Sequence, residues 1–403
     1  CALPFSSRAM SNPSRSDRSP YTPEGHAALG LFQLAPDLIH LNHGSYGAVP
    51  KIVAAEQDRW RAHIESNATG FFRDELPGEL RRLAGVAARR FGGKPDDWVF
   101  CENATAAVNS VLASFGLRDG DEIVTTSHAY GAVMKATRIW AGRFGAKLVV
   151  AQVPLIVESQ EQIVDAIAQS FSDRTKLLVV DHITSATAML FPVAQIAAAA
   201  RARGIAVLVD GAHAPGQVPL DVEAIGADWY TGNAHKWLFA PKGCGLLWTA
   251  PARQAQTLPV VLSHGAPDGY TPAFDWIGTR DVTPWLCFEA AARFHDEHGG
   301  ESLMTRNRKL AADASALLAA KLGMFVTAPI TMRGAMACLT LRPSPIDAAY
   351  AVNFIRRIRE CCGAIIPAYV FEDAFCIRIS AQIYNAMPDY EALAKVFSVA
   401  LQQ

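Results

Sequence analysis

Short apolar runs alternate with helical segments between residues 98 and 210, and this alternation restricts the fold more than any other feature of the sequence. The apolar runs lie at 98–102, 122–126, 147–153, 176–180 and 205–209. Strands that are buried on both faces have continuous apolar runs of this length. Strands connected by helices form a mostly parallel sheet with helices on both sides. We therefore predict an α/β fold in which the strands at 147–153 and 176–180 are both buried.

Composition narrows the class of protein. Half of the 403 residues are hydrophobic, which is enough for a large core and a smaller one. Lys and Arg together number 37, against 38 Asp and Glu. This balance indicates neither a nucleic-acid partner nor a membrane-surface partner. No apolar run reaches the roughly 18–20 residues that a membrane-spanning helix needs.

The eight cysteines are scattered along the chain and include no C-x-x-C pair. This usage predicts small buried side chains in a reducing cytoplasm, and neither a disulfide framework nor a zinc site. His40 and His43 stand three residues apart with no third candidate ligand nearby, so we predict no metal. His295 and His298 lie one helical turn apart among acidic residues and are expected to be exposed.

The order of these patterns divides the chain into regions. The first residues are rich in Ser, Pro and Arg and lack the apolar core of a signal peptide, and Met10 is the expected start of translation. Towards the other end, long helices precede short strands, which predicts a small α+β domain. The regions are a disordered tail (1–35), a segment at the mouth of the site (36–70), a large cofactor-binding domain (71–275) and the small domain (276–403).

The stretch from residue 206 to residue 248 carries the clearest chemical signal. A strand ends at Asp210, and Lys236 follows in an apolar setting. A lysine in such a pocket is partly desolvated and can form a Schiff base as a neutral nucleophile. A carboxylate at a strand end can keep a pyridine nitrogen protonated, so that the ring accepts electrons. Either residue alone is more often structural, but together they predict a pyridoxal phosphate (PLP) site. Lys242, in a Pro-Lys-Gly turn, is expected to be exposed.

Four motifs connect this stretch to a known family. They are LNHGSYGAVP at 41–50, VDGAHA at 209–214, TGNAHKW at 231–237 and PKGCGLLW at 241–248. Over about residues 36–400 the chain resembles the PLP-dependent fold type I enzymes of aminotransferase class V, in the branch of isopenicillin N epimerase and related C–S lyases. The resemblance implies a mostly parallel, seven-stranded-type sheet between helices, a smaller α+β domain, bound PLP and an obligate homodimer with shared sites.

The resemblance also implies how the PLP phosphate is held. Asn103 is a good N-cap for the helix that follows it, and a helix N-terminus favours an anion. The phosphate is expected at the backbone of Ala104 and at the backbone and hydroxyl of Thr105. Asn233 and His235, which flank the lysine motif, are expected to add further bonds to it.

A second group of residues is expected around the cofactor ring. The resemblance places an aromatic or His side chain flat on the ring, and Tyr130 is preferred over His128 for this position. Aromatic stacking of this kind contributes about 0.5–1.5 kcal/mol beyond the buried area. Ser185, or its neighbour Thr184, is expected near the phenolic oxygen. His213 is expected at the phenolic oxygen or the ring face.

The sequence identifies the substrate-binding residues less specifically than the cofactor-binding ones. The resemblance makes Arg378 the carboxylate-binding arginine, because a guanidinium binds a carboxylate through two parallel hydrogen bonds. Asn42 and His43 are expected to help to hold the same carboxylate, although their loop could be an ordinary turn. Thr279 is expected to reach the phosphate of the partner subunit.

Several reactions remain open for such a site. Lys236 is the natural base for the α-proton of an amino-acid substrate. Return of the proton to the other face is epimerisation, for which Tyr130 is an available donor. Loss of a β-sulfur group is a C–S lyase reaction, and protonation at the cofactor carbon is transamination. Cysteine desulfurase chemistry is disfavoured because 360–378 lacks the Arg-x-Gly-x-x-Cys loop. A nicotinamide dehydrogenase is disfavoured because no Gly-x-Gly-x-x-Gly follows an early strand.

Overall fold

The computed structural model describes residues 25–342 and 347–402. Met10 and most of the predicted tail therefore lie outside the described residues. Within the last part of that tail, a 3-10 helix, η2 (His26–Leu31), is formed and Phe32 is buried. Residues 26–32, which the sequence assigned to the tail, thus pack onto the core.

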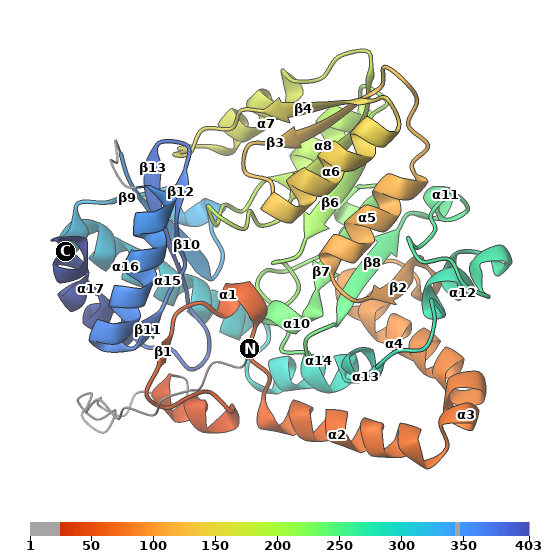
Figure 1. The fold of residues 1–403 in the computed structure, drawn as a ribbon, viewed down its shortest axis with the longest axis horizontal. Helices are drawn as coiled ribbons and strands as arrows, with labels where there is room; N and C mark the ends of the chain where they lie inside the picture. Colours follow the sequence, from red (N-terminus) through yellow and green to blue (C-terminus); the bar gives the residue numbers. More distant parts are fainter. Residues whose placement is uncertain (1–24, 343–346, 403) are drawn as a thin grey trace.

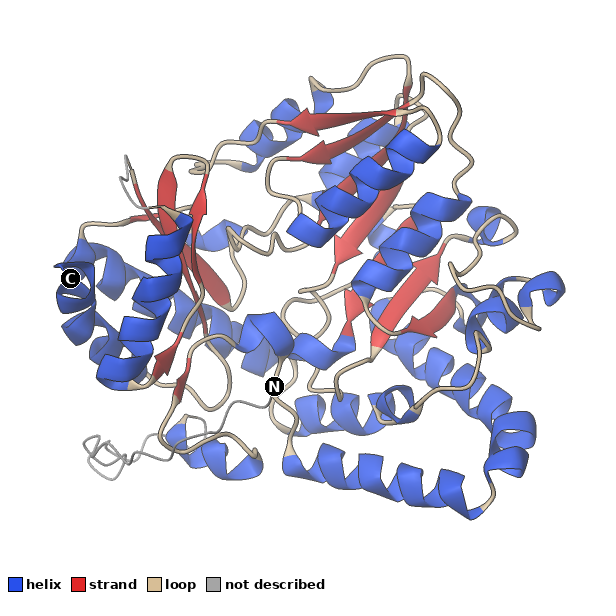
Figure 2. Ribbon diagram, viewed as in Figure 1, coloured by secondary structure: helices blue, strands red, loops and turns tan. Residues whose placement is uncertain are grey.

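A seven-stranded sheet forms the centre of the large domain (Figures 1 and 2). Its strand order is β2-β8-β7-β6-β5-β3-β4, and only β8 runs antiparallel to its neighbours. The strands are β2 (Trp98–Cys101), β3 (Glu122–Thr126), β4 (Lys147–Ala151), β5 (Thr175–Asp181), β6 (Ala206–Gly211), β7 (Trp229–Asn233) and β8 (Gly245–Thr249). This arrangement confirms the predicted, mostly parallel sheet. The predicted burial of the 147–153 strand was wrong, because β4 is the edge strand and Lys147 is exposed.

Helices cover both faces of this sheet, as Figure 1 shows. On one face, Leu177 and Val179 pack under α5 (Ala104–Ser114) and α6 (Gly131–Arg143). On the other face, Leu178 and Val180 belong to the core beneath α4, α7 and α8. These three helices are α4 (Leu76–Phe91), α7 (Gln160–Ala168) and α8 (Val193–Arg201). Consecutive residues of β5 point to opposite faces of the sheet. Because helices cover both faces, the consecutive residues 177–180 of this strand must all be apolar.

The remaining helices of the large domain lie around this core. They are α2 (Lys51–Ser66), α3 (Ala68–Gly70), η3 (Phe71–Glu75), η4 (Pro95–Asp97), α9 (Val222–Ile225), α10 (Ala234–Trp237), α11 (Pro251–Gln254), η5 (Ala266–Asp268), α12 (Tyr270–Asp275), α13 (Thr283–Leu286) and α14 (Phe288–Glu297). Because α13 and α14 pack against α2 and α4, the chain leaves the large domain later than the predicted boundary at 276. The predicted exposure of His295 was wrong: this side chain on α14 is fully buried, and its Nε2 lies 3.1 Å from the carbonyl oxygen of Gly216.

The small domain is built on a four-stranded antiparallel sheet of order β12-β13-β10-β9. Its elements are α15 (Glu301–Leu322), β9 (Phe325–Val326), η6 (Ile330–Met332), β10 (Met336–Leu341), α16 (Ala348–Cys362), β11 (Ala364–Ile365), β12 (Ala368–Phe371), β13 (Ala374–Ser380) and α17 (Met387–Gln402). The N-terminal strand β1 (Ile39–His40) pairs in parallel with β11. The chain then enters α1 (His43–Tyr46), which contacts α10 between the two domains (Figure 1). Within the described ranges, no helix combines the length and apolar character of a membrane span.

Candidate active site

A cavity of about 400 Å³ opens at the carboxyl ends of β5, β6 and β7, the edge at which open α/β sheets bind ligands. Nine of the predicted site residues line it: Ala104, Thr105, Tyr130, Ser185, Asp210, His213, Asn233, His235 and Lys236. Further lining residues, to which the sequence assigned no contact with cofactor or substrate, are Ser45, Tyr46, Asn103, Asp181, Ile183 and Ala212. The structure therefore gathers side chains from six separate segments around one space.

Lys236 projects into this cavity from the short helix α10, directly after β7. Its Nζ lies 3.2 Å from Nε2 of His213. Burial lowers the pKa of the Lys236 amine to about 8; the charge of Asp210 opposes this shift and that of Arg378 adds to it. About a tenth of the amine is therefore neutral at pH 7, far more than for an ordinary lysine, and the neutral form is the one that a nucleophile or a base requires. Lys242 is exposed, as predicted, and is not among the lining residues.

Two carboxylates stand side by side at the base of the cavity. Asp181 and Asp210 are paired residues at the ends of β5 and β6. Asp210 Oδ1 accepts from the N–H of Ala212 (3.0 Å), and Asp181 Oδ1 accepts from the N–H of Tyr130 (3.2 Å). Burial raises the pKa of both acids, and the charge of Asp210 raises that of Asp181 further, well above its ordinary value. The neighbouring charge of Asp210 therefore favours the protonated form of Asp181.

Asp181 is the residue of this site that sequence reasoning missed. Its signal was present, because Asp181 and Asp210 each end an apolar run, and the two runs are joined by one helix. Strands joined in this way are often neighbours and run parallel, so their last residues lie next to each other. In this segment, only Ser185 and Thr184 were assigned a position from the sequence.

The N-terminus of α5 forms another wall of the cavity. The side chain of Asn103 caps this helix, as predicted. Oδ1 of Asn233 accepts from the N–H of Ala104 at 2.8 Å, which leaves the amide N–H groups of Asn233 as its donors. Thr105 lines the cavity at the second residue of the helix. The first turn of a helix of this length presents N–H groups and a positive dipole end, which suit a phosphate.

His235 lies beside this wall in a neutral form. Its Nδ1 is 3.0 Å from the carbonyl oxygen of Cys244, so Nδ1 carries the hydrogen and Nε2 is an acceptor. Burial lowers the pKa of His235 to about 4. Nε2 can therefore bond a phosphate only if His235 first takes up a proton. A bound anion favours this protonation.

Arg378 on β13 is a buried cation next to the cavity. It is 4% exposed and donates to Oδ1 of Asn42 (3.1 Å), to Oγ of Ser45 (3.0 Å) and to the carbonyl oxygen of Ser185. Its Nε has no acceptor among the described residues, and no carboxylate is among the groups that shift its pKa, which burial lowers. A buried guanidinium without a carboxylate favours an anionic ligand.

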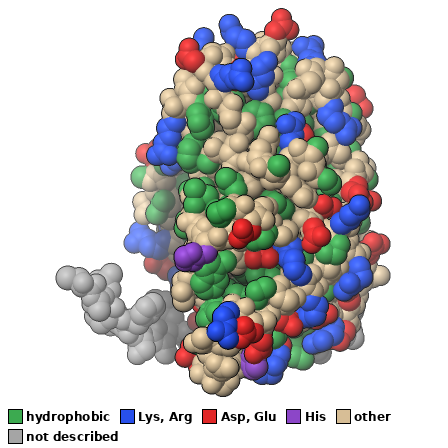
Figure 3. Space-filling view, turned by 90° about the vertical axis from the view of Figure 1, so that its right-hand side faces the viewer, with side chains coloured by type: hydrophobic (Ala, Val, Ile, Leu, Met, Phe, Trp, Pro, Cys, Tyr) green, Lys and Arg blue, Asp and Glu red, His purple; other side chains and the backbone are tan. Residues whose placement is uncertain are grey.

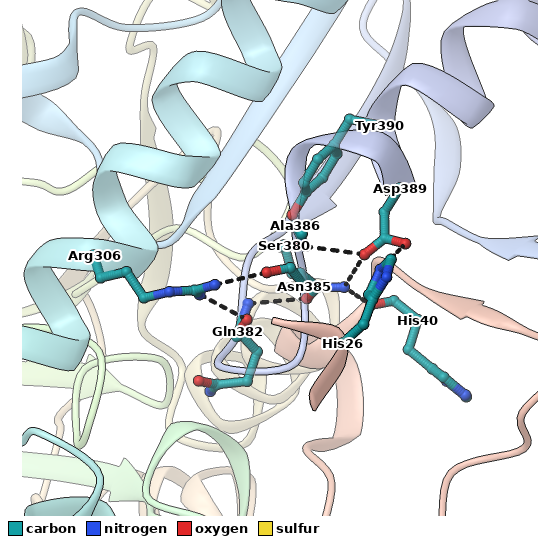
Figure 4. A network of polar contacts seen from close by, with 9 residues as sticks. All are labelled: His26, His40, Arg306, Ser380, Gln382, Asn385, Ala386, Asp389 and Tyr390. Carbon is teal, nitrogen blue, oxygen red and sulfur yellow. Dashed lines mark hydrogen bonds and ion pairs between the residues drawn. The ribbon is translucent and has the colours of Figure 1, made fainter. Parts of the chain in front are cut away.

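The strand end that carries Arg378 is held by the network of polar contacts in Figure 4. Arg306 of α15 donates to the carbonyl oxygens of Gln382 (3.1 Å) and Asn385 (2.7 Å). The Asn385 amide in turn donates to Oδ2 of Asp389 on α17 (3.3 Å). The turn after β13 is thus fixed to two helices of the small domain, which limits the freedom of the guanidinium.

His43 is not at the cavity wall, although its neighbour in the predicted pair, Asn42, contacts Arg378. It is buried under α10, where Nε2 donates to the carbonyl oxygen of Lys236 at 2.9 Å and Nδ1 accepts from the hydroxyl of Tyr384 at 2.9 Å. Burial lowers its pKa to about 3. Because α1 turns this side chain towards α10, His43 supports the backbone of the lysine.

Of the remaining predictions, one concerns a residue at the rim of the cavity and two concern residues outside it. Tyr130 lines the cavity at the start of α6 and is 45% exposed. His128 is buried elsewhere, with Nδ1 2.6 Å from Oγ1 of Thr187 and Nε2 3.0 Å from the carbonyl oxygen of Val153. Its ring packs 4.9 Å from that of Phe371, so it connects this loop to the small domain. Thr279 is exposed, in a loop outside this cavity.

These groups fit PLP. The partly neutral amine of Lys236, the carboxyl group of Asp210 and the N-terminus of α5 converge on one cavity, and they match the aldehyde, the ring nitrogen and the phosphate in chemistry. The buried Arg378 beside them suits the carboxylate of an amino acid. Together with the mostly parallel seven-stranded sheet and the small C-terminal domain, they define the class of PLP-dependent fold type I enzymes.

Comparison with known proteins agrees with this class. Residues 85–393 match the Aminotransferase class-V family, and the chain belongs to this family, with pyridoxal 5′-phosphate as cofactor. Isopenicillin N epimerase of Streptomyces clavuligerus is 32% identical over 91% of this chain and 96% of its own. Putative L-cysteine desulfhydrase 1 of Oryza sativa subsp. japonica is 31% identical over 88% of this chain and 81% of its own.

A solved structure shows the same fold. The cystine C–S lyase C-DES, in complex with its reaction product cysteine persulfide, superposes with a TM-score of 0.78 and covers 93% of this chain and 99% of its own. At 19% identity this likeness shows the fold alone. The family inferred from the motifs at 41–50 and 209–248 is thus confirmed, and its relatives include both an epimerase and a desulfhydrase.

Proposed function

We propose that the protein acts at the α-carbon of an amino acid or amino-acid derivative as an epimerase of the isopenicillin N epimerase type. A C–S lyase acting on a cysteine conjugate or sulfoxide is the alternative, and a class V aminotransferase is a further one. The observation that carries the proposal is the placement of the buried Lys236 amine in one cavity with the carboxyl group of Asp210, next to the buried guanidinium of Arg378. When bound, PLP supplies an electron sink that makes the α-C–H bond acidic.

The residues of the chain then divide the work. Arg378 binds the substrate carboxylate, and Asn42 holds the guanidinium in place through their 3.1 Å contact. Asp210 pairs with the ring nitrogen, while Thr105 and Asn233 bind the phosphate. The amine of Lys236 takes up the α-proton, for which its pKa of about 8 is well matched, since a base works best with a pKa near the operating pH.

Epimerisation also needs a proton donor on the opposite face, and we propose Tyr130 for this role. Its hydroxyl group belongs to a side chain of the cavity wall, and its backbone N–H is fixed by Asp181. In the lyase alternative, the same phenol would assist departure of the sulfur group. Among the described residues that line the cavity there is no cysteine, so we do not propose a persulfide-forming reaction.

We further propose a homodimer with shared sites. Val260, Val261 and Leu262 are more than half exposed, on a loop between β8 and α12. Figure 3 shows hydrophobic side chains gathered among charged ones on the side of the molecule that carries α12. Thr105 lines both the main cavity and a second one of about 330 Å³ that this loop borders. A partner at this surface would bring its Thr279 near the phosphate site.

A reducing compartment such as the cytoplasm is the proposed location. The seven cysteines among the described residues are free thiols, and five of them are buried. Thiols of this kind remain reduced where glutathione and thioredoxin act.

One experiment tests the function and separates the alternatives. The purified protein is supplied with PLP and then with L- and D-amino acids, cysteine conjugates and sulfoxides, and the visible absorbance, pyruvate release and stereochemistry are followed together. An epimerase interconverts the enantiomers without releasing pyruvate, whereas a lyase releases pyruvate and the sulfur group. Lys236→Ala should abolish the visible absorbance and turnover; cofactor that borohydride still attaches to the variant would place the Schiff base on another lysine.

A further inference from the structure

Trp237, the residue after the lysine, contacts the cavity through His213. Trp237 is 1% exposed, and its indole Nε1 lies 3.3 Å from Nδ1 of His213. The opposite nitrogen of the same ring, Nε2, lies 3.2 Å from Nζ of Lys236. The three side chains therefore form a chain of contacts from the core to the cavity.

The first contact determines which nitrogen of His213 carries the hydrogen. An indole N–H can only donate, and a buried donor needs an acceptor. The described residues give this indole one partner, Nδ1 of His213. Nδ1 must therefore be unprotonated. Burial lowers the pKa of His213 well below its ordinary value, so the ring is neutral. A neutral ring with a bare Nδ1 has its hydrogen on Nε2.

The second contact follows from the first. Nε2–H faces the amine of Lys236, and a donor can bond an amine only through its lone pair. This contact favours the neutral amine over the ammonium ion, which has no lone pair. The other charged groups acting on Lys236 are Asp181 on β5, Asp210 on β6 and Arg378 on β13. Among the described residues, the ring nitrogens of His213 contact only Lys236 and Trp237. The indole of Trp237 therefore sets the tautomer.

We propose that Trp237 is a positioning residue that fixes the tautomer of His213, so that this ring always presents an N–H to the cavity. Without cofactor, the N–H bonds the free amine of Lys236 and keeps it nucleophilic. With PLP bound, the same N–H is available to the phenolic oxygen, and this second half rests on the proposed function. The indole is therefore a part of the site that touches neither substrate nor cofactor.

Replacement of the indole by a ring without a donor tests the first half directly. In Trp237→Phe, His213 is free to move its hydrogen to Nδ1, and Nε2 can then accept from the Lys236 ammonium group. Two-bond ¹⁵N–¹H correlation spectra of histidine-labelled, cofactor-free protein report the tautomer, and His213→Gln assigns the signal. The wild type should show hydrogen on Nε2 only, and the variant a mixture or the Nδ1 form.

The reactivity of Lys236 provides the second readout. Loss of one hydrogen bond to the amine should slow its reaction with the PLP aldehyde at pH 7 by about three- to tenfold, and the rate should recover above pH 9. In His213→Gln, the glutamine amide always offers an N–H to Lys236, and the imidazole that Trp237 positions is absent. Adding Trp237→Phe to this variant should therefore change the capture rate by less than about twofold.

A matched control separates this effect from lost packing. Trp229 is also 1% exposed, and its indole donates to Oγ1 of Thr257 (2.9 Å). Trp229→Phe should lower thermal stability by a similar amount and leave both the tautomer and the capture rate unchanged. Hydrogen on Nδ1 of His213 in the wild type, or an unchanged tautomer and rate in a folded Trp237→Phe, would overturn the proposal. Because the spectra need no cofactor, this outcome is distinct from a failure of the protein to bind PLP.

Discussion

The rate at which the cofactor-free protein captures PLP should follow the titration of Lys236. Burial lowers the pKa of this amine from 10.5 to about 8, so the free-amine fraction is about 9% at pH 7, about 50% at pH 8 and about 99% at pH 10. Capture should therefore rise only about twofold between pH 8 and pH 10, whereas a lysine with an ordinary pKa would become about 80-fold more reactive.

Stopped-flow absorbance of the lysine-bound cofactor measures this rate across the pH range. Borohydride reduction followed by peptide mass spectrometry identifies the lysine that reacted. Lys236→Ala is the negative control, and Lys242→Ala, at an exposed lysine nearby, should behave like the wild type. A rate that keeps rising about tenfold per pH unit up to pH 10 would show that the amine is not desolvated, and the reasoning from burial would be refuted.

Three further variants probe the surroundings of this amine. Arg378→Ala should raise KM for amino acids roughly 100-fold with unchanged cofactor absorbance, and Arg378→Lys should raise it less; loss of PLP binding would contradict the assignment. Asp210→Asn removes a charge that raises the pKa of Lys236. PLP capture at pH 7 should therefore accelerate by at most about elevenfold, while turnover falls about 10²–10³-fold. Slower capture by this variant would refute the reasoning. Gly47→Ala places a Cβ against the carbonyl oxygens of α10 at a φ of +69° and should cost about 1–3 kcal/mol of stability. Gly116→Ala, at a φ of +76° with open space around it, should cost less in thermal denaturation, and equal losses would argue against the steric contact.

The sequence predicted the fold well because the signals were local. The apolar runs predicted β2, β5 and β6 correctly. A similar run in β4 misled the prediction of burial, because a run of apolar residues does not reveal which strand lies at an edge. The cap at Asn103 was recognised for the same reason, because a cap acts on the helix that directly follows it. His295 was misjudged because its acidic neighbours suggested solvent, whereas α14 turns this side chain inward.

The site could be predicted where its residues follow from strand order. Asp210 follows a predicted parallel strand, and the carboxyl ends of such strands share one edge of the sheet. Asn233 and Ser185, which the family resemblance implied, lie at the same edge. The positions of His128 and Tyr130 could not be separated in this way. They stand two residues apart in one turn, and only packing against Phe371 and Thr187 takes His128 away from the cavity.

The sequence by itself therefore determined the sheet, the cofactor class and the two central residues, Asp210 and Lys236, because apolar periodicity and strand ends are properties of neighbouring residues. Tertiary structure alone decided what surrounds them. Arg378 meets Asn42 across 336 positions of the chain, and His43 reaches the backbone of Lys236 across 193. Contacts over such distances depend on how the two domains pack, and no local pattern records the direction in which a side chain will point once they do.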